Sequence, residues 1–510
     1  MQSQVAQSPY GNYGFAILTA NALRTPDKVA LSYRGEQITF VELNRRINRI
    51  ANALLGLGIK PGQRVGSLLS EAMAIAGLYM AEAKIGVVLA AFNPYWDAAM
   101  VAEMGRRSKL DCLVFDGKHG DLVKQIAGDL PGVRILSMTE IEEAAKQASD
   151  AEPPLAGFND DLMGLFYTSG TSGVSKAVRH SHASSKAVSS VLLEVRRAEE
   201  SVFGTGPIIW GIGFSSTLGA AFYAGMKVAL EDDFGPAKFL EAVQRERISH
   251  VCMIPSQWAD LLANHPHEKY NLDSLAAILL GGEPLPATLR VKMQARLPNL
   301  SLYSFYGQTE APYSCLGAID SEKALGTAGF PRIGNAARTV GADGREIRGS
   351  AGELTLFGPH LTSGYDGQPD KTAESLRDGW FQTGDLATIS AEGRITILGR
   401  REDAIARGGR FVRPIEIEEA ALAITGVSEA GAVGAPAGAE TQKIILAVSL
   451  QAGSALTEGD LRGELAKRLP AGDVPELIVI ADELPHGQDA SGGRGKLQRR
   501  VIRDLYQDRL

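Results

Sequence analysis

Residues 162–176 read LMGLFYTSGTSGVSK. The apolar run from Leu162 to Tyr167 predicts a buried strand, and the following glycines and hydroxyl side chains end on Lys176. Small residues let backbone N–H groups approach a polyanion, and consecutive amides in such a loop form a concave anion site. The spacing matches neither the P-loop nor the dinucleotide-binding pattern. The stretch therefore predicts a phosphate-binding loop after a strand, with an ordinary surface loop as the alternative.

The length and composition allow a globular protein with more than one hydrophobic core. A chain of 510 residues has room for roughly three domain-sized units, and its net charge of -7 argues against a dedicated nucleic-acid surface. The three cysteines are far apart, which is typical of a reducing compartment, so we expect a cytoplasmic protein. The N-terminus has no charged side chain before Arg24, so it lacks the basic start of a signal peptide. The most apolar stretch, 77–92, contains Glu82 and Lys84, so no membrane span is predicted.

The N-terminal part alternates between strand and helix patterns. Residues 40–57 have an apolar face at helical spacing, 65–69 form a strand, 72–84 form a helix, and 87–91 form another strand. Such alternation predicts an α/β fold whose mostly parallel sheets are covered by helices.

Two further strands end in polar loops that contain glycine. The strand at 275–280 is followed by Gly281-Gly282-Glu283-Pro284, and the strand at 302–306 is followed by Gly307-Gln308-Thr309-Glu310. Ligands of open α/β sheets bind at the carboxyl ends of the strands. We therefore expect these loops to gather with the loop after Tyr167.

The second half of the chain predicts smaller units. Short strands and glycine turns indicate a β-rich subdomain at about 326–398, and the charged segment after the strand at 395–398 indicates a boundary. The prediction is a large N-terminal domain, 1–399, followed by a small, mobile α+β C-terminal domain, 400–510.

Six segments, taken together and in order, resemble the adenylate-forming superfamily of acyl-CoA synthetases, peptide-synthetase adenylation domains and luciferases. The resemblance covers nearly the whole chain and is greatest to acid–CoA ligases. Single motifs of this kind arise by chance, whereas six in the family's order do not. They are Tyr167-Thr168-Ser169-Gly170-Thr171-Ser172-Gly173 with Lys176, Tyr306-Gly307-Gln308-Thr309-Glu310, Gly352-Glu353-Leu354 with Gly364-Tyr365, Thr383-Gly384-Asp385, Gly399-Arg400 with Asp403, Gly408-Gly409 and Glu416-Ile417-Glu418, and Gly495-Lys496.

The resemblance implies a site for ATP and Mg²⁺. Tyr306 would stack on adenine, Thr309 would reach the α-phosphate, and Glu310 would hold the metal, because Mg²⁺ is held by one or two carboxylates together with phosphate oxygens. An ordinary buried tyrosine and a solvated glutamate are the alternatives. Ser175 and Ala177 depart from the family's usual proline and glycine. The implied nucleotide residues are Thr168, Ser169, Gly170, Thr171, Ser172, Gly173, Lys176, Gly282, Glu283, Pro284, Ser304, Phe305, Tyr306, Gly307, Gln308, Thr309, Asp385, Arg400 and Lys496.

Asp385 and Arg400 would bind the ribose, with Arg400 also able to contact phosphate. Their plain alternatives are a turn residue and a salt bridge at the domain boundary. His182 matches a family histidine near the acyl site, with a structural histidine as an equal alternative. The acyl pocket implied by the resemblance consists of His182, Trp210, Gly211, Phe214, Ser215, Gly281 and Gly307. For Trp210, a position in the hydrophobic core is the alternative to a position in the acyl pocket.

The C-terminal segment would supply a lysine that moves in and out of the site. Lys496 would stabilise charge on the α-phosphate, and its alternative is a solvated tail lysine. The family has fewer residues between its Leu-Pro pair and this lysine than lie between Leu484-Pro485 and Lys496 here. Glu402 matches the hinge about which the family rotates its C-terminal domain, and Gly409 would line the pantetheine tunnel.

The leading hypothesis is an ATP-dependent, AMP-forming acid–CoA ligase. It would form an acyl-AMP with Mg²⁺ and ATP, release pyrophosphate, and transfer the acyl group to the thiol of CoA. Catalysis is assigned to Lys496, Glu310, Thr309 and His182. The aromatic residues Trp210, Phe214 and Trp258 suggest an aryl, alicyclic or medium-sized acid, and no aspartate near Trp210 would pair with an amino-acid ammonium group.

Two other hypotheses remain open at this point. One is a stand-alone adenylating enzyme that loads a separate carrier protein or stops at acyl-AMP. The other is a silent nucleotide-binding protein, against which the retained Glu310, Asp385 and Lys496 argue. Beyond a small carboxylic acid, we expect neither nucleic acid nor membrane as a partner, and a homodimer is compatible with the sequence.

Overall fold

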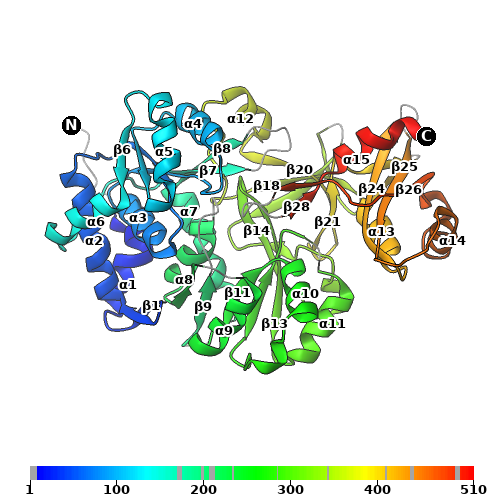
Figure 1. Ribbon diagram of the computed structural model, residues 1–510, viewed down its shortest axis with the longest axis horizontal. Helices are drawn as coiled ribbons and strands as arrows, with labels where there is room; N and C mark the ends of the chain where they lie inside the picture. Colours follow the sequence, from blue (N-terminus) through cyan, green and yellow to red (C-terminus); the bar gives the residue numbers. More distant parts are fainter. Residues whose placement is uncertain are drawn as a thin grey trace. The chain divides into compact units, whose positions relative to one another are not determined.

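A computed structural model provides the structure of the protein (Figure 1). The chain divides into two compact units, residues 1–337 with 356–382, and residues 338–355 with 383–510. The structure describes residues 8–168, 175–196, 200–205, 213–232, 235–283, 285–341, 344–407, 410–436, 441–488 and 494–510.

The first unit contains a nine-stranded sheet. Its six central strands run parallel, and antiparallel strands close both edges. In spatial order the strands are β15 (Phe330–Pro331), β14 (Ala311–Ala318), β13 (Ser301–Gln308), β12 (Ala277–Leu280), β11 (His250–Met253), β9 (Val202–Thr205), β10 (Lys227–Leu230), β1 (Val29–Tyr33) and β2 (Glu36–Thr39).

A second, six-stranded sheet in the same unit carries the strand before the predicted phosphate loop. Five strands are parallel and β8 runs antiparallel to β7. The order is β6 (Arg134–Ser137), β5 (Cys112–Phe115), β3 (Arg64–Leu68), β4 (Val88–Ala91), β7 (Leu162–Thr168) and β8 (Lys176–Ser181). The predicted α/β class with mostly parallel sheets is confirmed.

Several helices of the first unit begin at a side-chain cap. Thr39 and Glu42 form a capping box at the start of α2, and Ser137 with Glu140 does the same for α6. The longer helices are α2 (Phe40–Gly56), α3 (Ala72–Lys84), α4 (Ala98–Arg107), α6 (Met138–Gln147), α7 (His182–Ser189), α9 (Pro236–Glu246), α10 (Pro255–Asn264) and α11 (Ala287–Arg296); the shorter ones are α1 (Ala20–Arg24), α5 (Gly120–Ile126), α8 (Gly219–Tyr223) and α12 (Pro369–Ser375).

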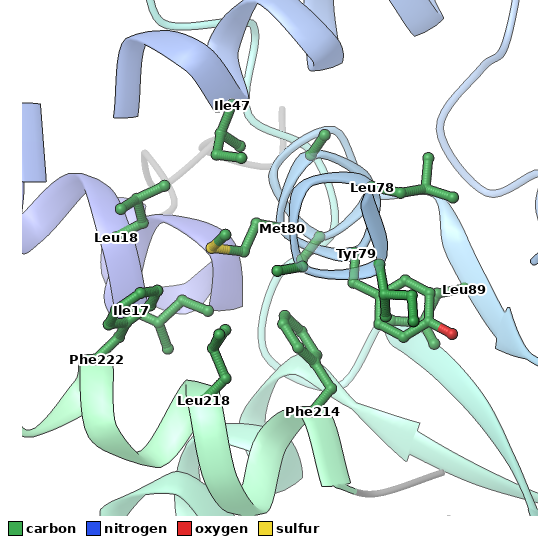
Figure 2. Close-up of a cluster of buried hydrophobic side chains, with 14 of the residues drawn as sticks. Ile17, Leu18, Ile47, Leu78, Tyr79, Met80, Leu89, Phe214, Leu218 and Phe222 are labelled. Carbon is green, nitrogen blue, oxygen red and sulfur yellow. The ribbon is translucent and has the colours of Figure 1, made fainter. Parts of the chain in front are cut away.

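Helix α3 lies at the centre of the largest hydrophobic core, and all of its residues are buried. Figure 2 shows its side chains, including Tyr79 and Met80, surrounded by residues of α2, α8 and two short π-helices, η2 (Phe15–Thr19) and η6 (Phe214–Leu218). The same core contains side chains from both sheets, such as Leu31 of β1 and Leu89 of β4. Burial all round is consistent with the mostly apolar sequence of α3, in which Glu82 and Lys84 are the charged exceptions.

A largely buried ion pair anchors the loop that precedes β7. The Lys84 ammonium, at the end of α3, donates to both carboxylate oxygens of Glu152 at 2.9 and 3.1 Å and to the side-chain oxygens of Asn44 and Asn48. Burial lowers the pKa of Lys84 to about 8, against the attraction of Glu152. The loop is thereby held on α2 and α3 by charge-assisted hydrogen bonds.

A third sheet fills the region predicted to be β-rich, and the division between the units passes through three of its strands. The sheet contains β17 (Glu346–Ile347), β16 (Ala336–Val340), β18 (Gly352–Phe357), β20 (Trp380–Ile389) and β19 (Leu376–Arg377), with β21 (Ile395–Arg400) paired to β20.

The second unit continues with a small α+β arrangement. Its remaining elements are β22 (Ile405–Arg407), β23 (Arg410–Val412), α13 (Pro414–Leu422), β24 (Val427–Pro436), β25 (Gln442–Leu450), α14 (Glu458–Arg468), β26 (Leu477–Ile480), β27 (His486–Gln488), β28 (Arg494–Leu497) and α15 (Arg499–Tyr506). The predicted boundary between residues 399 and 400 stays a prediction.

Sequence periodicity located most elements well. The helix predicted at 72–84 is α3 itself, and the helix predicted at 40–57 is α2, which ends at Gly56. No helix in the described part of the chain has both the length and the apolar character needed to cross a bilayer.

Candidate active site

The predicted phosphate loop connects two paired strands. Thr168 at the end of β7 lies opposite Lys176 at the start of β8, and the Ser175 hydroxyl donates to the Thr168 carbonyl at 2.6 Å. The five loop residues of the prediction, 169–173, lie outside the described residues. The structure thus places both ends of the predicted loop next to each other, at the base of a hairpin.

The strand β8 also contacts the turn that carries Thr309 and Glu310. His180 belongs to β8, and its Nε2 donates to the Thr309 carbonyl at 2.8 Å. Burial lowers the pKa of His180 to about 4, so the ring is neutral at pH 7 and can donate through one nitrogen only. Two segments 129 residues apart in sequence are joined by this bond.

Tyr306 and its neighbours lie at the end of β13. The Gln308 amide donates to the Tyr306 hydroxyl at 3.2 Å, and the Ser304 hydroxyl donates to the Thr327 carbonyl. A Cβ atom at Gly307 would lie 2.5 Å from the Tyr313 nitrogen, so only glycine fits there. Glycine at this position keeps β13 and β14 close as the chain turns back.

Gly281 and Phe305 pack against each other on neighbouring strands. A Cβ atom at Gly281 would lie 2.4 Å from the Phe305 ring, so the glycine leaves room for that ring. Gly282 has a left-handed backbone (φ 82°), and the Glu283 carboxylate accepts the Ser256 N–H. Glu283 is exposed, and Pro284 lies outside the described residues.

His182 is buried and serves the fold of the first unit. Its Nδ1 accepts the Tyr13 N–H at 3.0 Å, and Nε2 lies against Gly157, where a Cβ atom would come within 2.5 Å. Burial lowers the pKa of His182 to about 4. The geometry favours the structural reading of this residue, which the sequence left open.

Two residues expected in the acyl pocket are core residues in this structure. Phe214 is fully buried and packs edge-on against Tyr13 and Tyr79, and Ser215 is also fully buried. Trp258 likewise packs against Phe239 in a second core. A side chain with no exposed surface cannot wall an open pocket, so Phe214 and Trp258 give no support for an aromatic substrate. Trp210 and Gly211 lie outside the described residues.

The two predicted ribose ligands lie together in the second unit. Asp385 on β20 is opposite Arg400 on β21, and the guanidinium lies 3.2 Å from the carboxylate. Arg400 also donates to the Thr383 carbonyl, and the Thr383 hydroxyl accepts the Asp385 N–H. Asp385 is buried while Arg400 is half exposed, so the pair fixes an acceptor in a preformed position.

We expect Asp385→Ala to raise the KM for ATP about 10- to 100-fold, because a charged acceptor for ribose hydroxyls is removed. The measurement is pyrophosphate release at varied ATP concentration. Asp482→Asn, a change in the same unit, serves as the control and should leave KM unchanged. An Asp385→Ala variant with lower thermal stability but normal KM would mean that the carboxylate only holds Arg400.

The remaining predicted residues are in the C-terminal part. Glu402 is exposed in the turn after β21, and Gly409 lies outside the described residues. Lys496 belongs to β28, whose backbone pairs with β27 through His486 and Leu497. The side chain of Lys496 lies outside the described part of the structure.

One acidic side chain fits a magnesium ion that arrives with ATP. Glu310 is 8% exposed and presents a carboxylate at the β13–β14 turn. Among the described residues no group of three histidine, cysteine, aspartate or glutamate side chains could hold a metal by itself. A single carboxylate suits Mg²⁺, because this ion is bound largely through substrate phosphates and water.

Three residues around this turn have no role in the sequence-based prediction. They are His180, Tyr365 and Asp366, of which only Tyr365 belongs to one of the six motifs. No local sequence pattern predicts the hydrogen bond from His180 to Thr309. The Gly364-Tyr365 motif, in contrast, is visible in the sequence and could have pointed to Tyr365 as a site residue.

The chain matches two family descriptions, "AMP-binding enzyme" over residues 18–366 and "AMP-binding enzyme C-terminal domain" over residues 416–492. The first covers more than half of the chain, and the protein belongs to the AMP-binding enzyme family.

Its relatives include acid–CoA ligases. A feruloyl-CoA synthase from Amycolatopsis sp. is 30% identical over 94% of this chain and 97% of its own, and a 2-succinylbenzoate–CoA ligase from Bacillus cytotoxicus is 29% identical over 96% and 98%. These relatives confirm the predicted enzyme class, an AMP-forming acid–CoA ligase.

Solved structures agree with this assignment. MatB from Rhodopseudomonas palustris bound to ATP has a TM-score of 0.86 at 26% identity, covering 98% of this chain and 99% of its own. The o-succinylbenzoate CoA synthetase of Bacillus subtilis with its acyl-adenylate intermediate has a TM-score of 0.82 at 25% identity, covering 96% and 98%. The same synthetase has been solved with ATP and magnesium, in agreement with the predicted cofactors.

Proposed function

We propose that the protein joins a carboxylic acid that carries an aromatic ring to coenzyme A. The activity is that of an AMP-forming ligase. A carboxylate oxygen bonds to the α-phosphorus of ATP, and the bond from that phosphorus to pyrophosphate breaks. The sulfur of CoA then bonds to the acyl carbon, the carbon–oxygen bond to AMP breaks, and the thiol proton leaves to solvent.

The chain's own residues position these reactants. The loop between Thr168 and Lys176 would bind the β- and γ-phosphates through backbone N–H groups and hydroxyls, and Asp385 would accept from the ribose. Bound Mg²⁺ would offset phosphate charge, and Glu310 is the residue that would hold it. Since attack requires the acid and ATP to be aligned, most of the acceleration comes from positioning and charge stabilisation.

One observation in the first unit is the main support for the proposed nucleotide site. The hairpin that flanks the phosphate loop is tied to the Thr309–Glu310 turn by His180, so two motifs distant in sequence meet at one place. A nucleotide needs phosphate and adenine contacts at the same time, and the meeting of these two segments supports the proposal that one nucleotide contacts both. A storage or scaffold protein has no need of it.

The aromatic ring is supported by two kinds of observation. The curated relatives are named for feruloyl and 2-succinylbenzoate groups, and both groups contain an aromatic ring. In the structure, Phe305 is half-buried beside Gly281 and packs against Tyr313 with ring centroids 4.5 Å apart. Aromatic side chains favour stacked or edge-on contact with an aromatic ligand.

The experiment is an acid panel in a pyrophosphate-release assay, with mass spectrometry to detect acyl-CoA. We expect kcat/KM to be up to about tenfold higher for hydroxycinnamic and benzoic acids than for straight-chain acids of equal carbon number, because aromatic contacts contribute roughly 0.5–1.5 kcal/mol. Preference for straight-chain acids would contradict the substrate class. Activity with amino acids alone would contradict the enzyme class as well.

Four further expectations about this protein remain predictions. Transfer to a separate carrier protein would appear as acyl-AMP without acyl-CoA when CoA is supplied. A homodimer is measured by light scattering, and a cytoplasmic location by cell fractionation. Rotation of the C-terminal domain, 400–510, about Glu402 would let one pocket serve both half-reactions.

A further inference from the structure

Residues 362–366 form a short segment, here called the strap, that lies across β8 and the β13–β14 turn. The Thr362 N–H donates to the Glu310 carbonyl at 2.8 Å. On the other side, Ser363 and Gly364 exchange backbone hydrogen bonds with Arg179, and the Asp366 N–H donates to the Ala177 carbonyl. The strap therefore connects the strand after the phosphate loop with the turn that carries Glu310.

A buried carboxylate anchors the strap. Asp366, with 7% of its side chain exposed, accepts two hydrogen bonds from Arg64 at 2.7 and 3.0 Å and a third from Arg179 at 3.0 Å. Bidentate arginine–carboxylate contacts fix orientation as well as distance. The residue before Asp366, Tyr365, is thus held in a defined place.

Tyr365 contacts both predicted phosphate-site charges. Its hydroxyl donates to Oε1 of Glu310 at 2.8 Å, and both side chains are buried. The Lys176 ammonium lies 5.6 Å from the centroid of the Tyr365 ring, within the range of a cation–π contact. One side chain therefore connects an anionic and a cationic member of the proposed nucleotide site.

We propose that Tyr365 is a positioning residue for Mg·ATP, which it serves by orienting the Glu310 carboxylate through its hydroxyl. The proposal rests on the proposed function, in which Glu310 holds the metal. Mg²⁺ demands near-ideal octahedral geometry, so a carboxylate that can rotate is a poorer ligand than one whose second oxygen is fixed. The hydroxyl supplies that restraint.

The test is the metal dependence of nucleotide binding in the full-length protein, without acid. Calorimetry measures the Kd of α,β-methylene-ATP with saturating Mg²⁺ and with EDTA. We expect Tyr365→Phe to reduce the gain from Mg²⁺ about tenfold while leaving the Kd in EDTA unchanged, because outer-shell partners of metal ligands typically contribute that much. Phenylalanine keeps the ring beside Lys176, so only the hydroxyl is tested.

Tyr79→Phe is the matched control. Tyr79 is a buried tyrosine of α3 whose hydroxyl pairs with Ser67 at 2.8 Å, away from the site, so its loss should leave the Mg²⁺ gain unchanged. Glu310→Gln separates the two assignments. If Glu310→Gln abolishes the gain and Tyr365→Phe does not reduce it, the role of Tyr365 is overturned; if Glu310→Gln has no effect, the metal assignment falls and the role of Tyr365 with it.

Activity provides a second readout of the same variant. The Mg²⁺ concentration for half-maximal pyrophosphate release should rise about tenfold in Tyr365→Phe, with the KM of the acid unchanged. A general packing defect would instead lower kcat at every Mg²⁺ concentration, and this result would overturn the proposal.

Discussion

Lys496→Ala is expected to slow acyl-adenylate formation about 10²- to 10³-fold while leaving thioester formation from supplied acyl-adenylate nearly unchanged. The reason is that a cation placed on the α-phosphate stabilises charge that develops only in the first half-reaction. Removing a single group of this kind from an active site has effects of that size.

The spacing before Lys496 is longer than in the family, and part of it is paired. The strands β27 and β28 run antiparallel, with Gln488 opposite Arg494, and Lys496 belongs to β28. We expect the lysine to keep the family's role despite the extra residues.

Two assays check the first prediction. Pyrophosphate exchange measures the adenylation step, and acyl-CoA formation from chemically prepared acyl-adenylate measures the transfer step. Lys467→Ala, which removes a lysine paired with Glu464 on α14, is the control and should match the parent protein. Equal losses in both steps would assign Lys496 to general binding or folding instead.

Acidification from pH 7 to 5 is expected to lower the free energy of unfolding steeply, through three buried histidines. Burial lowers the pKa of His180 and His182 to about 4 and that of His360 to about 3. The unfolded chain binds protons near pH 6.5 while the folded protein does not, so stability is full above pH 6.5 and falls between about 6.5 and 4. Between pH 7 and 5 each histidine contributes about 2 kcal/mol to this loss.

Two other ionisable groups, Glu82 and His119, have the opposite effect on the pH dependence of stability. Burial raises the pKa of Glu82 well above its ordinary value, so the folded protein holds this carboxyl's proton more tightly than the unfolded chain does. Asp116 raises the pKa of His119 against the effect of burial. Both groups favour the folded state at lower pH and reduce the net loss.

Urea unfolding at pH 7 and pH 5 measures the second prediction. His182→Gln should reduce the pH-dependent loss by about 2 kcal/mol, and Glu82→Gln should increase the loss. His265→Gln, at the surface beside Asp260, should leave it unchanged. If His182→Gln and the parent protein show the same pH dependence of unfolding, the prediction is wrong. The buried ring would then take up its proton in the folded protein as readily as in the unfolded chain.

Local patterns were sufficient for most of the fold. The apolar run ending at Tyr167, the helix at 72–84 and the strands before Gly281 and Gly307 are where periodicity predicts them, because burial and backbone geometry impose those periods directly. The family followed from six motifs in order, and the comparisons confirm it.

Side-chain placement could not be predicted in the same way. The sequence places Phe214 among pocket aromatics, but Tyr13 and Tyr79 enclose it in the core. A one-dimensional pattern shows that a residue is apolar, whereas which apolar neighbours it meets depends on how the helices pack around α3.

Sequence information was enough for the α/β class, the positions of the strand-end loops, the enzyme class and its need for ATP, Mg²⁺ and CoA, since these depend on periodicity and on short motifs. Three-dimensional packing was needed to learn that His180 reaches Thr309, that two arginines clamp Asp366, and that Tyr365 lies between Glu310 and Lys176. These contacts join residues tens to hundreds of positions apart, and their geometry is set by sheet register and packing, which no local pattern encodes.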